Sequence, residues 1–272
     1  MSMSEIKKIL ERLRTFTVPE LCDGLPLYHV MDHEIKQRVG STHIVGTAVT
    51  VDVPSGEGGI VADAILALKP GDILVLSGKG NCECSYWGDH RSLCAKMMGA
   101  EGVIVDGAFR DIEGCENVGF PIFAKGLTCG TAQKSGVGAI NVPVACGNQV
   151  VMPGDIICAD RNGVLVMRPE EALEAMAKSL DKKQRQEATV REMIETGKVM
   201  TKIKKKSISS LYDFDMKYQL SIEEKSAYTR GQLLAPDRIE HASGIGISAW
   251  GQPSGHDVKG YREFYGKPDL QS

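Results

Sequence analysis

A turn that leads into a buried strand occurs twice in this chain, and this repeat most constrains the fold. The letters PGDILV stand at residues 70–75 and PGDIIC at residues 153–158. In each copy a proline–glycine–aspartate turn precedes a continuous apolar stretch, which is typical of a strand inside a sheet. Two copies indicate related β units within one domain, because a solenoid would need several regular repeats.

Helical and strand patterns alternate around these two copies. Apolar residues at helical spacing predict helices over residues 60–68 and about 90–98. Runs of β-forming and apolar residues predict strands at 45–53, 73–76, 102–106, near 120–124 and near 139–145. Such alternation favours an α/β fold, in which helices cover a central sheet.

The two ends of the chain differ from this central part. Residues 1–16 have the pattern of an amphipathic helix, and a highly charged helical stretch is predicted from residue 169 to about residue 206. Residues 207–272 have frequent glycine, proline and serine and few apolar runs, so they could not pack a core of their own. We therefore expect an α/β domain over residues 1–206 and an extension over 207–272 that wraps this domain or a neighbouring subunit.

The composition argues against several classes of protein. Of the 272 residues, 42% are hydrophobic, and the net charge is −3 at pH 7. The chain can therefore bury a core, but it has no overall attraction for nucleic acid or for an anionic membrane. No apolar run reaches membrane-spanning length, and the first residues alternate charged and apolar side chains, unlike a signal peptide. We expect a cytoplasmic protein without a nucleic-acid or membrane partner.

The cysteines and glycine-rich segments give weaker signals. Most of the eight cysteines stand singly in apolar or loop segments, as small buried hydrophobic residues do. Cys82 and Cys84 could form half of a zinc site, but no second cysteine or histidine pair stands at zinc spacing. The glycine-rich segments 56–59 and 244–246 lack the pattern of a nucleotide-binding loop, so we assign their glycines to turns.

The most informative segment is a predicted helix start. Asp89 is a good N-cap residue and Gly99 a good helix stop, which predicts a helix from about His90. The first backbone N–H groups of a helix lack intrahelical partners and carry the positive end of its dipole. A substrate carboxylate could therefore bind at this helix start.

Arg110 and Asp111 follow the predicted strand at 102–106, after Gly107, which is expected to let the chain turn sharply. Ligands usually bind at strand ends in α/β sheets. The arginine offers a cation for an enolate oxygen, and the aspartate offers an oxygen ligand for a hard divalent metal. Alone, Asp89 would be a helix cap, and the other two residues would be a surface ion pair. Their joint spacing around one helix–strand unit favours a functional site.

The spacing of these residues resembles that of a known family. Asp89 is followed by twenty residues and then by Arg110 and Asp111, as in the class II pyruvate aldolases typified by 4-hydroxy-4-methyl-2-oxoglutarate aldolase. That family shares its fold with the regulator of ribonuclease E activity. Supporting matches stand at residues 46–51, 70–72, 105–108 and 121–126, and the resemblance covers residues 15–200 in outline.

The resemblance implies a fold and an assembly. The fold would be a layered α/β/β/α sandwich with a central mixed sheet, similar to swivelling domains, plus an irregular C-terminal extension. The chain would form a homo-oligomer, a trimer or a pair of trimers, with sites between subunits. Glu187 is the residue best placed to supply the acidic group that the C-terminal helix of one subunit adds to the metal site of its neighbour.

The resemblance also implies a reaction. Asp111 would bind a magnesium or manganese ion directly, Asp89 would hold a metal-bound water, and Arg110 would contact the pyruvyl group and stabilise its enolate. The expected substrates are small 2-oxo acids. The enzyme would cleave 4-hydroxy-2-oxo acids to give pyruvate, or decarboxylate oxaloacetate, as a metal-dependent lyase.

The same resemblance assigns the binding of the substrate. Gly88, His90 and Arg91 would bind the substrate carboxylate through the backbone at the helix start, together with the side chain of Arg110. His90 is also a candidate general base. We favour the simpler interpretation that its ring points to solvent, because it stands in the first turn of a helix.

Two other functions compete with this hypothesis. The first is a non-catalytic protein-binding regulator, as among the ribonuclease-regulating relatives of the same fold. Those relatives lack the first aspartate of the pattern, whereas this chain has Asp89. The second is an enzyme on the same scaffold that acts on another acid substrate, or a methyltransferase. The absence of a glycine loop of the S-adenosylmethionine-binding type argues against methyl transfer.

Overall fold

A computed structural model describes residues 3–25, 29–40 and 43–203 of the chain. The chain divides into two compact units, residues 1–176 and 177–272. The predicted extension over 207–272, and the predicted boundary before it, lie outside the described residues. In the part of the chain that is described, no helix is long and apolar enough to cross a membrane.

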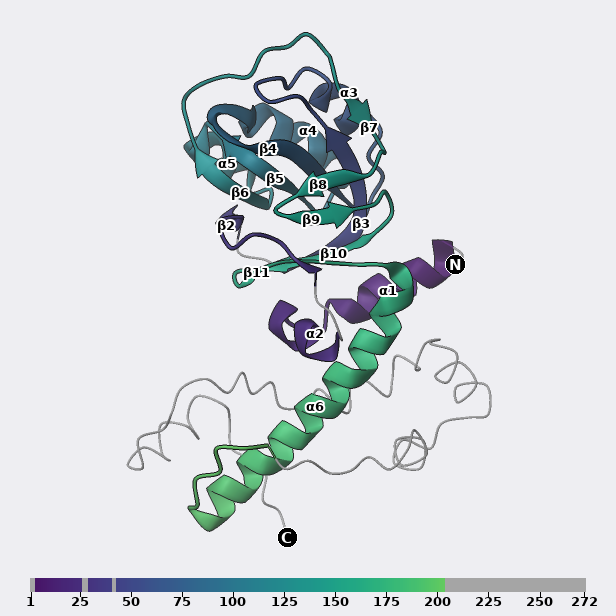
Figure 1. The fold of residues 1–272 in the computed structure, drawn as a ribbon, viewed down its shortest axis with the longest axis vertical. Helices are drawn as coiled ribbons and strands as arrows, with labels where there is room; N and C mark the ends of the chain where they lie inside the picture. Colours follow the sequence, from purple (N-terminus) through teal and green to yellow (C-terminus); the bar gives the residue numbers. More distant parts are fainter. Residues whose placement is uncertain (1–2, 26–28, 41–42, 204–272) are drawn as a thin grey trace. The chain divides into compact units, whose positions relative to one another are not determined.

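Nine of the described strands form one mixed sheet (Figure 1). Its centre, in the order β3-β4-β5-β6, is parallel, and its flanking strands pair antiparallel. The full order is β1-β11-β10-β3-β4-β5-β6-β2, and β7 pairs with β3. These strands are β1 (His29–Val30), β2 (Lys36–Val39), β3 (Ile44–Asp52), β4 (Asp72–Trp87), β5 (Gly102–Phe109), β6 (Ile122–Leu127), β7 (Ala139–Ile140), β10 (Ile156–Asp160) and β11 (Gly163–Met167). The predicted α/β fold with a central mixed sheet is confirmed.

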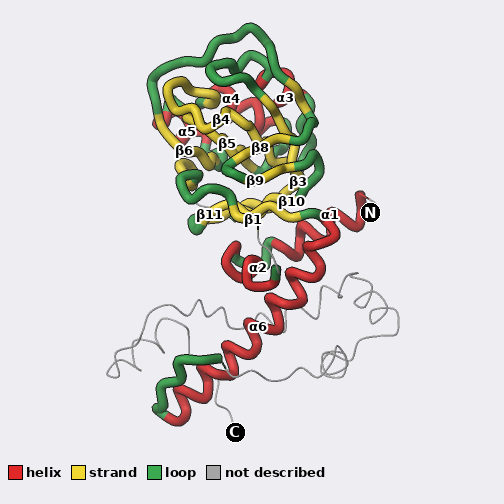
Figure 2. The backbone as a smooth tube through the Cα atoms, viewed as in Figure 1, coloured by secondary structure: helices red, strands yellow, loops and turns green. Residues whose placement is uncertain are grey.

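Helices cover one face of the sheet and a hairpin covers the other (Figures 1 and 2). Along β4, Leu74 and Leu76 belong to the core on the helical side, whereas Ile73 and Val75 belong to the core under the hairpin. Successive side chains of a strand point to opposite faces, so a continuous apolar run is buried on both. The covering elements are α3 (Val61–Leu66), α4 (Asp89–Met97) and α5 (Ile112–Val118) on one side, and β8 (Val144–Cys146) with β9 (Gln149–Val151) on the other.

The remaining helices flank this core. Helix α1 (Met3–Leu13) contacts β3, and α2 (Val18–Gly24) contacts β10 and β11. Helix α6 (Pro169–Thr196) runs from the first unit into the second and ends earlier than the charged stretch predicted to reach residue 206. The strand predicted near 139–145 is in fact two short strands, β7 and β8.

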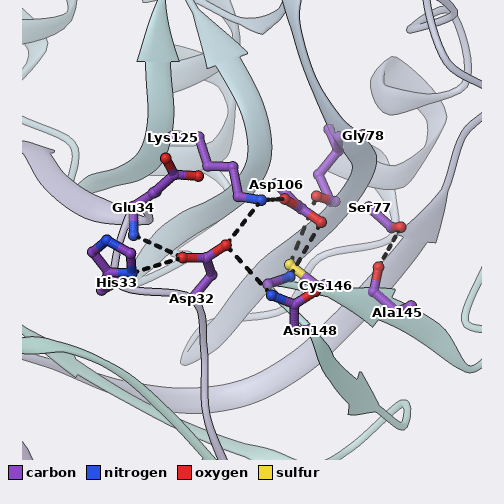
Figure 3. A network of polar contacts seen from close by, with 12 residues as sticks. Asp32, His33, Glu34, Ser77, Gly78, Asp106, Lys125, Ala145, Cys146 and Asn148 are labelled. Atoms are coloured by element: carbon purple, nitrogen blue, oxygen red, sulfur yellow. Dashed lines mark hydrogen bonds and ion pairs between the residues drawn. The ribbon is translucent and has the colours of Figure 1, made fainter.

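A polar network joins the hairpin to the sheet (Figure 3). Lys125 Nζ lies 3.0 Å from Asp106 Oδ1 and 3.3 Å from Asp32 Oδ2. The other oxygen of Asp106 accepts the N–H of Gly147, in the hairpin turn, at 3.1 Å. Partial burial is the largest single influence on the pKa of Lys125 and would lower it. The two carboxylates together outweigh burial, so this pKa is raised. Each buried charge in the network therefore has a partner of opposite charge, as burial requires.

Two predicted strand boundaries near the candidate site are wrong. Strand β4 continues to Trp87, and β5 continues to Phe109. Gly107 consequently lies within a strand and does not turn the chain. A Cβ atom at this position would lie 2.8 Å from the carbonyl oxygen of Asn81 and 2.9 Å from the ring of Tyr86. The glycine is needed because β4 and the ring of Tyr86 approach the backbone of β5 so closely.

Candidate active site

A pocket of about 230 Å³ lies where β4 and β5 end. This volume is below that of pockets for drug-sized ligands and suits a small organic acid. The described residues that line it all belong to the first unit. Its lining residues are Ser85, Trp87, Gly88, Asp89, His90, Arg91, Arg110, Asp111, Thr131, Ala132 and Lys134.

Helix α4 begins at the pocket, one residue earlier than predicted. Its N-cap is Gly88, and Asp89 is its first helical residue. Asp89 nevertheless acts as a local cap, because its Oδ1 accepts the N–H of His90 at 2.6 Å. On the opposite side, a Cβ atom at Gly114 of α5 would lie 2.7 Å from Asp89 Oδ2. The glycine in α5 leaves the space that the Asp89 carboxylate occupies.

Arg110 and Asp111 form the turn from β5 into α5. The N–H of Arg110 donates to the carbonyl of Trp87 at 3.0 Å, which holds the turn against the end of β4. Asp111 has a φ of 58°, in the left-handed region, and its backbone is the N-cap of α5. Non-glycine residues in this region store strain and cluster at functional sites.

The side chains of this turn contact each other and face the pocket. Arg110 Nε lies 3.1 Å from Asp111 Oδ2, and both side chains stay about two-fifths exposed, at 40% and 44%. A Cβ atom on Gly88 would lie 3.0 Å from the same Asp111 oxygen. A glycine at position 88 therefore lets the helix start approach the Asp111 carboxylate.

Arg91 reinforces the wall of the pocket through its side chain, which the sequence did not indicate. Its Nη2 donates to the carbonyl of Gly58 at 2.7 Å, and its Nη1 donates to the carbonyl of Tyr86. Burial lowers the pKa of this guanidinium, and the charge of Arg110 adds to the effect. An arginine side chain stays protonated under such shifts, so two positive charges lie close together at the pocket.

The residues that sequence reasoning missed come mainly from the loop after β6. Thr131 and Lys134 line the pocket, and Lys134 adds a third cationic side chain to it. An isolated bridge pairs Thr131 with Ser85 of β4, which carries this loop to the pocket. No periodicity or motif marks the loop in the sequence. Only its pairing across the fold brings it to the site.

The predicted site residues fall into two groups. Six of the seven line the pocket together: Gly88, Asp89, His90, Arg91, Arg110 and Asp111. Glu187 lies in α6, within the second unit. Its assignment to a neighbouring subunit's site, like the chemical role of each of the other six, stays a prediction.

The carboxylates of the pocket suit a hydrated divalent ion. Two of them, Asp89 and Asp111, line it. Among the described residues, no group of three or more histidine, cysteine, aspartate or glutamate side chains is arranged to hold a metal. Magnesium is commonly held by one or two carboxylates and keeps several waters. The donor set of one chain therefore fits magnesium or manganese better than a fully protein-coordinated zinc.

A comparison with known families identifies the relatives of this fold and pocket. The sequence model of the RraA-like family, described as Aldolase/RraA, matches residues 18–166, which is more than half of the chain. The chain belongs to the RraA-like family. The matched part includes every residue that lines the pocket.

Individual RraA-like proteins carry different names. A protein of Halalkalibacterium halodurans, provisionally named 4-hydroxy-4-methyl-2-oxoglutarate aldolase, is 38% identical over 184 residues, which cover 68% of this chain and 87% of that protein. The structure of an uncharacterized protein from Pseudomonas syringae pv. tomato matches with a TM-score of 0.61 and 25% identity, over 71% of this chain and 94% of that one. The structure of the RNA-processing inhibitor RraA from Thermus thermophilis matches with a TM-score of 0.53 and 25% identity. The match covers 56% of this chain and 93% of that one.

Proposed function

We propose that this RraA-like protein is a lyase that needs magnesium or manganese and releases pyruvate from 4-hydroxy-2-oxo acids, or decarboxylates oxaloacetate. One observation carries the proposal. Asp89, at the start of α4, and the adjacent Arg110 and Asp111, at the end of β5, line one pocket. The similarity to a protein named as an aldolase supports the same reaction class.

Two carboxylates of the pocket have separate tasks in this proposal. Asp111 would hold the divalent ion, and Asp89 would act in its outer shell. When bound, the ion would supply Lewis-acid polarisation of the 2-oxo group of the substrate. The left-handed backbone of Asp111 sets the direction in which its side chain leaves the turn, and its Oδ2 lies 3.1 Å from Arg110 Nε. A defined position of this kind is what a metal ligand requires.

Cleavage of a 4-hydroxy-2-oxo acid breaks the bond between C3 and C4. The hydroxyl at C4 loses its proton and becomes a carbonyl, and the bonding electron pair passes to the 2-oxo oxygen as the enolate of pyruvate. The guanidinium of Arg110 would donate to that oxygen as its charge develops, and such a preorganised donor typically contributes about 2.7–4 kcal/mol. The carboxylate of Asp89 would accept the hydroxyl proton and return it to C3 of the enolate, which gives pyruvate.

The cations of the pocket suit a substrate with two carboxylates. The guanidinium of Arg91 is engaged by two backbone carbonyls, so it shapes the wall. Arg110 and Lys134 remain for the ligand, since both line the pocket. Arg110 at the turn would face the pyruvyl end of the substrate, and Lys134 would face the carboxylate at the distal end.

A substrate panel tests the proposed function. The purified chain is assayed for pyruvate release from oxaloacetate, from 4-hydroxy-4-methyl-2-oxoglutarate and from 4-hydroxy-2-oxopentanoate, with magnesium and with excess chelator. Because oxaloacetate also decarboxylates without an enzyme, each rate is compared with a protein-free blank. We expect pyruvate above this blank from at least one diacid, in the magnesium arm only. Release no faster than the blank from all three acids, with magnesium or manganese, would contradict a lyase function and favour the non-catalytic regulator.

A further inference from the structure

A buried carboxylate joins two loops at the pocket. Glu57, in the loop between β3 and α3, is only 6% exposed. Its Oε1 accepts the N–H groups of Gly58, Gly59 and Gly136 at 3.0, 2.6 and 3.2 Å. Its Oε2 accepts the N–H and the hydroxyl of Ser135 at 3.0 and 2.5 Å. Five donors from two loops therefore converge on one side chain.

These hydrogen bonds keep the carboxylate ionised. The hydroxyl of Ser135 is the largest cause, and with the backbone N–H groups it lowers the pKa of Glu57 to about 2. Hydrogen bonds to an ionised acceptor are roughly twice as strong as those between neutral groups. Glu57 therefore holds both loops at every pH at which the protein would normally act.

The first loop supports one cation of the pocket. The carbonyl of Gly58, next to Glu57, accepts Nη2 of Arg91 at 2.7 Å. Because Glu57 also binds the N–H of Gly58, the position of that carbonyl depends on the carboxylate. A shift of this loop would move the anchored guanidinium.

The second loop carries another cation. Lys134 stands between Gln133 and Ser135. The carbonyl of Gln133 accepts the N–H of Gly58 at 2.9 Å, and Ser135 donates twice to Glu57. The backbone on both sides of Lys134 is thus bound to the first loop. Lys134 itself lines the pocket.

The glycines around Glu57 follow from this close approach. A Cβ atom at Gly59 would lie 2.6 Å from the backbone nitrogen of Gly136 and 2.9 Å from Glu57 Oε1. The glycine-rich segment 56–59 therefore does more than turn the chain. It lets two backbones meet around one carboxylate.

We propose that Glu57 is a positioning residue of the pocket, which fixes the loop of Lys134 so that this lysine binds the distal carboxylate of a 2-oxo diacid. Glu57 touches no substrate itself. Through Lys134 it sets the preference for diacids over 2-oxo monoacids. This inference rests on the proposed function, because the preference concerns the substrates of that reaction.

The test compares the KM of two substrates in single and double variants. Glu57→Gln keeps the shape of the side chain but removes its charge and presents an amide N–H₂ to backbone donors. We expect it to raise the KM for 4-hydroxy-4-methyl-2-oxoglutarate roughly tenfold, the size expected when one charge-assisted contact is lost. The KM for the monoacid 4-hydroxy-2-oxopentanoate and both kcat values should change by less than about twofold, since kcat responds to interactions made only in the transition state.

Lys134→Ala should reproduce this pattern, and the double variant should show little further loss, because residues that act as a unit are not additive. Ser135→Ala removes one of the five hydrogen bonds and should give a smaller rise in the same KM, which keeps the proposal testable if Glu57→Gln fails to fold. Glu20→Gln is the matched control. Its carboxylate caps α2 by accepting from Thr17 and does not line the pocket.

Two results would overturn the positioning role: equal KM changes for diacid and monoacid, or full additivity of Glu57→Gln and Lys134→Ala. Absence of pyruvate release from the unmodified chain would instead reject the proposed function. In that case, amide hydrogen exchange still tests whether Glu57 holds the loop of Lys134. The N–H groups of Ser135 and Gly136 should exchange faster in Glu57→Gln than in the unmodified chain, and equal rates would remove Glu57 from any positioning role.

Discussion

Asp89 is both a structural and a candidate catalytic residue, and its two oxygens show why. Its Oδ1 accepts the N–H of His90, as a helix-capping group does. The other oxygen lies beside Gly114 of α5, and the residue lines the pocket. The simple explanation as a cap and the catalytic explanation therefore do not exclude each other at this position.

Asp89→Asn separates the two explanations. The asparagine oxygen can still accept the N–H of His90, so the melting temperature should stay unchanged. The substitution removes the charge that would accept a proton, and general acid–base groups typically contribute about 10²- to 10⁴-fold in rate. We expect a folded protein whose kcat for pyruvate release falls by that factor. Unchanged turnover would leave Asp89 as a cap only.

Arg110→Lys tests the other side chain that would contact the reacting group. A lysine keeps the charge but loses the planar fork of donors, so it should not reproduce the contact with the enolate oxygen. We expect kcat/KM to fall about 10²-fold, the lower end of the range for a lost oxyanion donor. Arg161→Lys, an exposed arginine between β10 and β11, is the control. Activity equal to that of the control would remove Arg110 from the site.

Among the elements of the core, apolar patterns predicted α3, α4 and the central strands, but not α5 or the full length of β4. Its first part is a continuous apolar run. Beyond it, Lys79 and Gly80 have positive φ and polar residues follow, so the pattern of a strand is lost. Pairing with β5 keeps the later residues in the sheet, with register shifts along the way. Such tertiary pairing has no local signal in the sequence.

The contrast between local patterns and tertiary pairing also explains which residues of the candidate site could be predicted. Asp89, Arg110 and Asp111 could be predicted because they flank one helix–strand unit at a recognisable spacing. Lys134 could not, because its loop is held at the pocket by long-range contacts, among them the bridge at Ser85 and the hydrogen bonds to Glu57. Local patterns identified the residues at strand and helix ends, and the fold supplied the rest.

Gly107→Ala tests the close contact between β4 and β5. An added Cβ would meet the carbonyl of Asn81 at 2.8 Å and the ring of Tyr86 at 2.9 Å inside the core. Overpacking of this kind typically lowers the free energy of unfolding by about 1–3 kcal/mol. We expect a reduced midpoint in urea unfolding. A midpoint equal to that of the unmodified chain would show that the strands separate at little cost.

At the scale of the whole molecule, we expect a homo-oligomer, a trimer or a pair of trimers, with Glu187 of one subunit near Asp111 of its neighbour. The described residues that line the pocket belong to one chain, and in this proposal Glu187 of the neighbouring subunit would add a further carboxylate to it. Light scattering at micromolar concentration should give the mass of a trimer or hexamer. A monomeric mass would contradict the shared site.

Mixing two inactive variants tests the sharing itself. Asp111→Ala and Glu187→Gln each damage every site when used alone. In randomly mixed oligomers, roughly a quarter of the sites should combine an intact Asp111 with an intact Glu187 from the neighbour, because the interface of a ring is heterologous. Co-expressed variants should therefore regain about that share of activity. No recovery in mixed oligomers would place both residues within one chain's site or remove Glu187 from it.

In the proposed function, Asp111 holds a divalent ion on which pyruvate release depends. The most direct measurement is the rate of pyruvate release from the best diacid substrate, for the unmodified chain and Asp111→Ala, as magnesium is titrated after chelator treatment. Asp63→Ala, an exposed aspartate of α3, is the control. We predict saturable activation by magnesium in the unmodified chain and the control, and no activation in folded Asp111→Ala. Full turnover in excess chelator, or normal activation of Asp111→Ala, would contradict the account.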